Sequence, residues 1–334
     1  MILCRGSASA CVGLTLFLLY VAAPAARAQD PSGEMAPVLT NRVLELDGQG
    51  AYVELPVATF EGLREATLEA WVRTDEWGYF SQWFAYGTQD RWRALGLNNF
   101  DRSSALQFFV YPGRPEDLQV VGVMAPSEAG MWLHLAAVSG PGGMRLYLNG
   151  LLVGFRAYDG SFADLGPATH AFLGRSSWED NAPFHGALDE VRLWSVVRSA
   201  KQIAANMNRR LAGDVPGLAA LWNFDSGDAR DKTVGGYDGQ LVDGARCEPL
   251  PFPGVDSPNR PAVLRTVVRD ASGATVKGGA VRLTSLTGRV FEYATGDAGF
   301  MSLAVPDTGW FDVEVLSEVT EILRRKIHLT SGEL

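Results

Sequence analysis

The stretch Arg145-Leu-Tyr-Leu-Asn-Gly150 carries the pattern that decides the fold. Leu146 and Leu148 fall on one face of an extended chain and the aromatic Tyr147 falls on the other, which is the period of a β-strand. The Asn-Gly pair at the end of the stretch supplies the positive φ angles that a tight hairpin turn needs. This stretch therefore predicts one arm of an antiparallel hairpin.

The same pattern of short strands and turns extends in both directions, from Val43 to about Val242. Each run is rich in apolar and aromatic residues and is bounded by Gly, Pro, Asn or Asp. The predicted strands include Val43 to Leu46, Ala51 to Leu55, Thr67 to Val72, Ala105 to Tyr111, Leu133 to Ser139, Arg145 to Leu148, Leu188 to Trp194 and Ala219 to Asn223. Many short strands at this spacing predict an all-β sandwich or barrel.

One segment follows a helical period instead. Ile203, Met207 and Leu211 recur every fourth residue, and Ser199 to Gln202 has the spacing of a capping box. The pattern predicts a short amphipathic helix over residues 200–211 that packs its apolar stripe on the sandwich. A helix that binds a partner is the alternative, although three apolar positions usually face the protein's own core.

The chain is predicted to contain two domains joined by a linker. Residues 249–261 contain five prolines and no periodicity, which favours a stiff linker. Strand-like runs return over residues 262–330, separated by turns such as Asp-Ala-Ser-Gly and Pro-Asp-Thr-Gly. A second, smaller β-sandwich is therefore expected after the larger domain, which we place at residues 39–248.

Residues 1–28 have the features of a secretory signal peptide. Arg5 precedes an apolar run from Val12 to Ala23, and the small residues Ala26 and Ala28 frame a cleavage point before Gln29. A membrane anchor is the alternative, but the run is shorter than the roughly 20 residues that cross a bilayer. The protein is therefore expected to be exported, to the periplasm, the cell surface or the medium, with no membrane insertion after the signal is removed.

Charge and cysteine content restrict the partners. Cleavage would remove two arginines and no acidic residue, which changes the formal net charge from -9 to -11. Such a balance disfavours nucleic acid and anionic membranes, which select clustered Lys and Arg, and it suits cations. The mature chain would keep Cys247 alone, so neither a disulfide framework nor a Cys/His metal site is expected.

Ordered blocks of sequence resemble the laminin G-like, concanavalin A-type jelly roll. The blocks are Arg42 to Leu55, Ala66 to Val72, Trp132 to Val138, Leu146 to Gly154, Phe172 to Arg175, Phe184 to Trp194, Ile203 to Met207 and Gly217 to Asp225. They occur in the order of that family over about 200 residues. The resemblance implies a concanavalin A-like antiparallel β-sandwich of two curved sheets with one short helix.

The smaller domain resembles the carboxypeptidase regulatory-like, transthyretin-type sandwich. The likeness is carried by looser motifs, Val268 to Gly273, Gly279 to Leu283, Thr295 to Phe300 and Pro306 to Phe311. Domains paired in this way often stand at the front of longer surface or sensor proteins.

Catalytic patterns are not evident. A polysaccharide hydrolase needs two carboxylates across a cleft, at alternate positions if they share a strand. Asp189 and Glu190 are adjacent, so a regular strand would point them to opposite faces. Asp312 and Glu314 alternate, but their apolar neighbours take the core face. The histidines lack metalloprotease spacing, and no nucleophile elbow or phosphate loop occurs, so no enzyme is expected.

Calcium is the cofactor that the resemblance suggests. Many laminin G-like domains bind calcium, which takes carboxylate and carbonyl oxygens as ligands. The resemblance pairs the Asp-Gly turn after the first strand with a later Leu-Asp-Glu strand, here Asp47 and Asp189. The alternative is that Asp47 only shapes its turn and that Asp189 accepts a backbone hydrogen bond.

Two aromatic stretches are candidates for ligand contact. Sugars stack their apolar ring faces on aromatic side chains and hydrogen-bond to nearby polar groups, so Trp178, Glu179, Asp180 and Asn181 are expected to form a binding rim. Trp92, at the end of an aromatic-dense stretch, is added to this site. The alternative is that these rings are core residues, because a sandwich buries about half of its aromatic residues.

Three functions remain open. The first is a non-catalytic adhesion or sensory module that recognises a glycan or an extracellular protein, with calcium as a cofactor. The second is a purely structural interaction domain of a larger envelope or sensor protein, which buried Trp178 and Trp92 would favour. The third is a polysaccharide hydrolase or lyase, which an apolar covering over the sheet would exclude.

Overall fold

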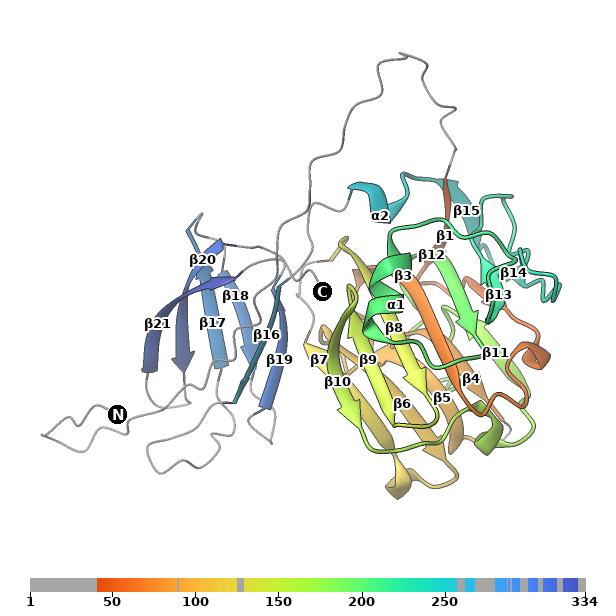
Figure 1. Ribbon diagram of the computed structural model, residues 1–334, viewed down its shortest axis with the longest axis horizontal. Helices are drawn as coiled ribbons and strands as arrows, with labels where there is room; N and C mark the ends of the chain where they lie inside the picture. The colour runs from red at the N-terminus through yellow and green to blue at the C-terminus, as the bar shows by residue number, and fades with distance from the viewer. Residues whose placement is uncertain are drawn as a thin grey trace, which may run out of the picture. The chain divides into compact units, whose positions relative to one another are not determined.

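The computed structural model describes residues 41–88, 90–124, 129–256, 262–267, 280–286, 288, 290–294, 300–305, 309–316 and 321–329. These residues fall into two compact units, one formed by residues 41–256 and the other by the strands that follow (Figure 1). The predicted signal peptide lies outside the described residues. Within the described part, no helix is long and apolar enough to cross a membrane.

The first unit contains two antiparallel sheets. The first sheet has the order β10 (Leu151–Arg156), β9 (Met144–Leu148), β8 (Trp132–Ser139), β3 (Ala66–Glu76), β12 (His185–Trp194), β1 (Arg42–Asp47) and β15 (Arg246–Pro249), with β13 (Leu218–Trp222) paired to β12. The second sheet has the order β14 (Gln240–Val242), β2 (Tyr52–Glu54), β11 (His170–Leu173), β4 (Gln82–Gly87), β5 (Arg93–Asn99), β6 (Ala105–Pro112) and β7 (Gln119–Met124). Three short 3-10 turns connect strands, at Val57–Thr59, Pro115–Asp117 and Phe162–Leu165. The all-β, concanavalin A-like sandwich is confirmed.

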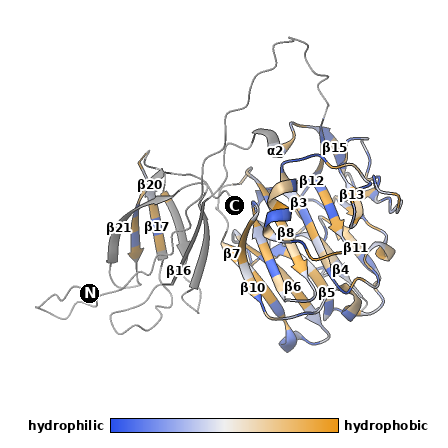
Figure 2. Cartoon of the chain, in the orientation of Figure 1, coloured by the Kyte–Doolittle hydropathy of each residue, from blue (hydrophilic) through white to orange (hydrophobic). Residues whose placement is uncertain are grey.

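Aromatic residues fill the space between the two sheets. Phe60 lies at the centre, with its ring centroid 5.3 Å from that of Phe84, 5.5 Å from Tyr86 and 5.2 Å from Phe162. The Phe60 ring also stacks with Trp222 of β13, in the first sheet. Alternate residues on each strand face this core, and Figure 2 shows the resulting mixture of hydrophobic and hydrophilic residues along the strands. The inner faces are thus occupied, and any ligand site must lie on an outer face or on loops.

The predicted hairpin is present. Asn149 and Gly150 have φ angles of 49° and 80°, and Leu148 pairs with Leu151 across the turn from β9 to β10. The Asn149 side chain adds a second role, because its Oδ1 accepts a hydrogen bond of 2.7 Å from the backbone N–H of His134. The turn is therefore fixed both by its backbone angles and by a buried contact to β8.

Helix α1 (Ala200–Met207) begins where the capping box predicts. The Ser199 side chain accepts a hydrogen bond from the Gln202 N–H at 3.3 Å, and Gln202 Oε1 accepts one from the Ser199 N–H at 2.8 Å. Ile203 packs on Ala136 and Tyr147, so the helix covers the outer face of the first sheet. The prediction that its apolar stripe faces the sandwich is confirmed.

The prediction that the helix continues to Leu211 is wrong, because α1 ends at Met207. Trp71 Nε1 donates to the Met207 carbonyl at 2.8 Å, and Arg192 of β12 donates to the Asn206 carbonyl at 3.0 Å. These side chains satisfy carbonyls that a further helical turn would have used. Leu211 instead packs beside Trp194 in a separate apolar cluster.

The second unit also consists of strands. In it β16 (Ala262–Val267) pairs with β19 (Phe300–Val305), and a four-stranded sheet has the order β18 (Val290–Ala294), β17 (Ala280–Ser285), β20 (Gly309–Leu316) and β21 (Glu321–Leu329). On β20, Phe311, Val313 and Val315 are buried and Asp312 is exposed, as the alternation predicts. The carboxypeptidase regulatory-like resemblance and the domain boundaries stay predictions, and several of the motifs quoted for this resemblance fall outside the described residues.

The described part of the expected linker is not a simple extended spacer. Residues 253–256 form a short helix, α2 (Pro253–Asp256), and the Leu250 N–H donates to the Asn41 carbonyl at 3.1 Å. The side chain of Phe252 is buried. Residues 250–256 therefore belong to the first unit.

Candidate functional site

The outer face of the second sheet carries an aromatic surface. Phe84 and Tyr86 of β4 point into the core, so the alternate positions on the neighbouring strands point outward. On β6 these outward positions are Phe109 and Tyr111, which lie opposite Gly96 and Ala94 of β5. A side chain at Gly96 would collide with the Phe109 ring at 2.7 Å, so the missing side chain gives the ring its place.

Three rings from separate segments meet on this surface. The Trp178 centroid lies 5.7 Å from that of Tyr111, and the Trp92 centroid lies 5.2 Å from that of Tyr111. We call Trp92, Tyr111 and Trp178 the aromatic platform. All three are partly exposed, whereas Phe109, 5.6 Å from Trp178, is only 4% exposed. The structure thus brings the two predicted tryptophans together through Tyr111.

The loop that carries Trp178 is held by hydrogen bonds of its own. Gly174 N–H donates to the Trp83 carbonyl and Phe184 N–H donates to the Gly174 carbonyl, both at 3.0 Å, so the loop leaves and returns at one point of the sheet. Within it, Ser176 Oγ accepts from the Trp178 N–H at 3.0 Å and from Asn181 Nδ2 at 2.8 Å. The loop conformation is therefore fixed without a ligand.

These contacts separate the predicted rim residues by role. Asn181 is engaged within the loop and only partly exposed, so it shapes the loop. Glu179 and Asp180 are exposed beside Trp178. Next to Trp92, Arg91 is exposed, with its guanidinium 5.0 Å from the Trp92 ring. The aromatic platform is thus flanked by charged groups of both signs.

A second aromatic group continues the same face toward β2. His170 and Phe172 of β11 stack at 5.1 Å, and Phe172 meets Tyr52 edge to face at 5.3 Å. His170 Nε2 lies 2.9 Å from Ser177 Oγ in the Trp178 loop. Burial, aided by nearby Arg175, lowers the pKa of His170 below its ordinary value, so the ring is neutral at pH 7. The face is therefore continuous from Tyr52 to Trp92.

Paired carboxylates are missing from the strands of this sheet. Within the bounds of its seven strands in the first unit, all of them described, Glu54 is the one acidic residue. The strands of this sheet therefore do not supply the two carboxylates that a glycosidase places on either side of the scissile bond.

The predicted calcium pair is not brought together. Asp47 of β1 lies opposite His185 of β12. Asp189 lies four residues further along β12, so the rise of an extended chain separates its Cα from that of His185 by about 13 Å. Calcium ligands lie about 2.3–2.6 Å from the ion, so the two carboxylates do not fit one site. Among the described residues, no group of three or more His, Cys, Asp or Glu side chains could hold a metal ion.

Each of the two aspartates has a local role. Asp47 Oδ1 accepts from the Gln49 N–H at 2.8 Å and from the Ala51 N–H at 3.4 Å, which shapes the turn after β1. Asp189 accepts from Asn41 Nδ2 and from the Glu190 N–H, both at 2.8 Å. Burial raises the pKa of Asp189 well above its ordinary value, with the Glu190 charge adding to the shift. Calcium as a cofactor of this protein stays a prediction.

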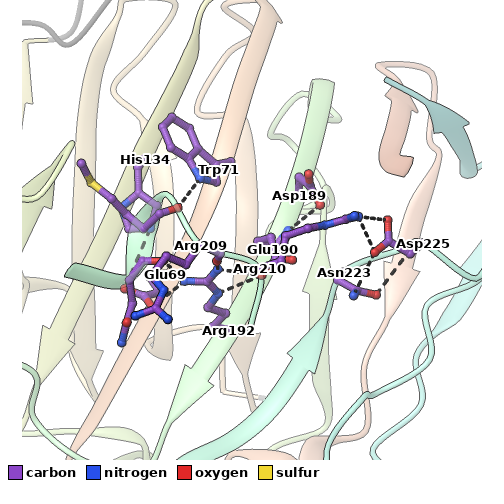
Figure 3. A network of polar contacts seen from close by, with 12 residues as sticks. Glu69, Trp71, His134, Asp189, Glu190, Arg192, Arg209, Arg210, Asn223 and Asp225 are labelled. Carbon is purple, nitrogen blue, oxygen red and sulfur yellow. Dashed lines mark hydrogen bonds and ion pairs between the residues drawn. The ribbon is translucent and has the colours of Figure 1, made fainter. Parts of the chain in front are cut away.

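A polar network is buried on the outer face of the first sheet, beneath α1 (Figure 3). Arg192 donates to Glu190 Oε2 at 2.7 and 3.0 Å, and it lies 3.5 Å from Glu69. Glu69 also accepts from Trp194 Nε1 at 2.9 Å. Glu69 and Arg192 are 0% exposed. We call this group, together with His134 and Trp71, the buried network.

The expectation that Asp189 and Glu190 point to opposite faces is wrong. The pairing of β12 with β3 shifts between Asp189 and Arg192, and Glu190 has a φ of 49°. This β-bulge inserts one residue, so Asp189, Glu190 and Arg192 all contribute to the same buried layer. Sequence alternation assumes a regular strand and cannot detect such an insertion.

The buried network secures α1 and is closed to solvent. Arg192 donates to the Asn206 carbonyl and to the Arg209 carbonyl, and Trp71 donates to the Met207 carbonyl. A histidine is present too, but burial and the nearby arginines lower the pKa of His134 well below its ordinary value. Because its carboxylates are covered, the network holds structure and offers no surface for a substrate.

Sequence reasoning missed Tyr111 and Arg175. A signal for Tyr111 existed, because Gln107, Phe109 and Tyr111 alternate with the core residues of β6 and so share the outer face. Tyr111 contacts two tryptophans that are distant from it in the sequence. These contacts depend on which strands pair and in which register, and a local sequence pattern does not reveal that. Arg175 gave no signal, since its contacts come from β2 and β11.

Comparisons with known proteins agree with this architecture. Residues 47–204 match the family described as the concanavalin A-like lectin/glucanases superfamily. Mouse pappalysin-1 is 27% identical over 211 residues, which cover 58% of this chain and 13% of pappalysin-1, so the match spans a small part of that protein.

The chain is also similar to parts of solved structures. A protein from Bacteroides ovatus proposed to bind carbohydrate is 24% identical, with 65% of this chain and 62% of that chain covered and a TM-score of 0.48. The SAP-like pentraxin of Limulus polyphemus is 15% identical, with 64% and 97% covered and a TM-score of 0.44. The family match over residues 47–204 and the two antiparallel sheets together support a laminin G-like sandwich with the concanavalin A-like fold in the first unit.

Proposed function

We propose that the first unit is a non-catalytic glycan-binding module of an exported protein, and that the aromatic platform is its binding surface. The observation that carries the proposal is the meeting of Trp92, Tyr111 and Trp178 from three separate segments at one partly exposed place. Large amphipathic rings on a fixed scaffold bind ligands at little conformational cost.

The chemistry of the platform suits a sugar. The C–H face of a pyranose packs on an aromatic ring, while its hydroxyl groups need hydrogen-bond partners at the edge. Glu179 and Asp180 on one side and Arg91 on the other provide acceptors and donors. A concanavalin A-like lectin/glucanase fold is consistent with this role.

Absence of catalysis is part of the proposal. It is supported by the single acidic residue within the strands of the second sheet, Glu54, and by the burial of the Asp189 and Glu190 carboxylates. A two-carboxylate mechanism needs both groups in contact with the substrate. We expect bound oligosaccharides to be recovered intact after long incubation.

The test is binding of oligosaccharides on a glycan array, followed by titration of tryptophan fluorescence. Trp178→Ala and Trp92→Ala should each weaken binding at least about 10-fold, because truncation of a central aromatic contact commonly costs 2 kcal/mol or more. Phe155→Ala is the matched control, since Phe155 is 58% exposed on β10 of the other sheet.

A structural role for the Trp178 loop is the competing function, and the burial of Phe109 favours it. Trp178 covers this ring, so the loop also seals apolar surface. If both tryptophan variants bind as the wild type does, or if all three variants weaken binding equally, the platform is not the binding surface and the purely structural interaction domain becomes the better account.

A further inference from the structure

Arg175, at the start of the Trp178 loop, is an exposed arginine held by aromatic rings. Its guanidinium carbon lies 4.8 Å from the Tyr52 ring centroid and 5.2 Å from that of Phe172. Stacking of this kind fixes the planar guanidinium while its N–H groups at the edge stay open to a ligand. No described residue forms a hydrogen bond or an ion pair with it.

This lack of an ion pair distinguishes Arg175 from eight other arginines of the described chain. Ion pairs with carboxylates occupy Arg73, Arg93, Arg192, Arg198, Arg210, Arg230, Arg246 and Arg282. The protein has 38 acidic residues against 29 basic ones, so carboxylates are plentiful. Glu54, exposed and opposite Phe172, is the acidic residue of this sheet, and it forms no ion pair with Arg175. A positive charge is therefore kept available on an acidic protein.

Arg175 belongs to the same surface as the aromatic platform. Phe172 stacks on His170, His170 contacts Ser177, and Ser177 directly precedes Trp178. The Cα atoms of Arg175 and Trp178 are at most about 11 Å apart, because the two residues are three positions apart in the sequence. An oligosaccharide of two or three units spans such a distance, so one ligand can reach both side chains.

We propose that the glycan bound by the platform is acidic, and that Arg175 binds its carboxylate or sulfate group. The inference rests on the proposed function and adds the class of ligand. A guanidinium donates two parallel hydrogen bonds to a planar or tetrahedral oxyanion, and a pre-positioned guanidinium loses little entropy when it does so. Arg91 adds a second stacked positive charge beside Trp92, again without a described ion-pair partner.

The carboxylates near the platform restrict how such a ligand lies. Glu179 and Asp180 are exposed immediately after Trp178 and would repel an anion placed there. The acidic group is therefore directed to the Tyr52 end of the surface, where Arg175 stands, while a neutral ring lies over Trp178 and Tyr111. The expected ligand is thus an oligosaccharide with an acidic unit at one end and an uncharged unit at the other, bound in one orientation.

The experiment is calorimetric titration of the full protein with two matched ligand pairs. One pair is a neutral oligosaccharide with one terminal galacturonate unit and the methyl ester of the same oligosaccharide, which differ in the carboxylate charge. The other is a sulfated galactan oligosaccharide and its desulfated form. We expect the wild type to bind at least one acidic member about 10-fold more tightly than its neutral partner, and the pair that responds identifies the anion.

Variants assign the preference to Arg175. Arg175→Ala should reduce affinity for the acidic ligand to that for the neutral one and leave the neutral ligand unaffected. Arg175→Lys should retain an intermediate preference, because a lysine keeps the charge without the bidentate fork. Arg230→Ala, at an exposed arginine paired with Asp228, controls for loss of one positive charge and should behave as the wild type.

The outcomes separate the two proposals. Equal affinity for the acidic and neutral members, or a preference that survives Arg175→Ala, overturns the role of Arg175. If the neutral ligands still bind and Trp178→Ala abolishes that binding, the proposed function stands without it. If the wild type binds neither member of either pair, the role of Arg175 is contradicted, and the glycan array alone decides the proposed function.

Discussion

The outer faces of the two sheets use similar residues in different ways. On the first sheet, Trp71 and Arg192 are covered by α1 and the segment after it, and each donates to protein acceptors. On the second sheet, Trp178 is partly exposed and Arg175 is exposed, and each contacts aromatic rings without a described side-chain hydrogen bond. The comparison teaches that the same residue types have two roles. Where the tryptophan and the arginine are buried and their N–H groups are hydrogen-bonded, they stabilise the fold; where they are exposed and their N–H groups have no described acceptor, they form a candidate binding surface.

The largest expected difference is between the two arginines. Arg192→Met should lower the free energy of unfolding by about 3–5 kcal/mol, because it leaves the Glu190 and Glu69 carboxylates buried without their partner. Arg175→Met should change it by less than about 0.5 kcal/mol, as exposed substitutions usually do. Urea unfolding of both variants measures the difference. Similar losses for the two variants would erase the distinction between the faces.

A pH dependence should come from the covered face. His134 stays neutral in the fold, whereas in the unfolded chain it takes up a proton near pH 6.5. The unfolded state therefore binds more protons below this pH, and stability falls as pH drops, by up to about 1.4 kcal/mol per unit for one group. His134→Gln should flatten the decline between pH 7 and 5 in denaturant unfolding. An unchanged slope would show that His134 is protonated in the fold.

A smaller difference is expected between two tryptophans. Trp71→Phe keeps an aromatic ring but removes the donor to the Met207 carbonyl, so it should cost about 1–2 kcal/mol. Trp92→Phe removes no described hydrogen bond of the indole and should cost less than about 0.5 kcal/mol. Thermal unfolding compares the two variants directly. A larger loss at Trp92 would mean that the platform, too, is part of the core.

The smallest effect concerns calcium. Asp47 of β1 lies opposite His185, about 13 Å along β12 from Asp189. A calcium response that depends on both aspartates is therefore not expected. Thermal unfolding with calcium or excess chelator, on the wild type and on Asp47→Asn and Asp189→Asn, tests this. Loss of a calcium-induced rise in Tm in both variants would require a shared site that the register does not allow.

The sequence predicted the regular parts of this molecule and failed where distant segments meet. Strand alternation and the Asn149-Gly150 turn depend on local chemistry, so they were recoverable. The end of α1 depends on Trp71 and Arg192, and the bulge at Glu190 depends on the pairing of β12 with β3. Neither is encoded within a single window of residues.

The candidate site was predicted in the same partial way. Aromatic residues in polar loops suit sugars, and this pattern predicts Trp178 and Trp92 as sugar contacts. The structure brings the two tryptophans together. Their link through Tyr111 and the position of Arg175 follow from the register of β5 with β6 and from the contacts of β2 with β11. The order of strands in a sheet is a long-range property, so the composition of the surface required the structure.

Trp178→Ala, assayed in parallel for oligosaccharide binding and for Tm, tests the central claim most directly. The claim is that the outer face of the second sheet binds a ligand and the outer face of the first holds the fold. We predict that binding falls at least about 10-fold while Tm changes little, as for a substitution at a partly exposed position. Unchanged binding together with a large fall in Tm would contradict the account and make Trp178 a structural residue.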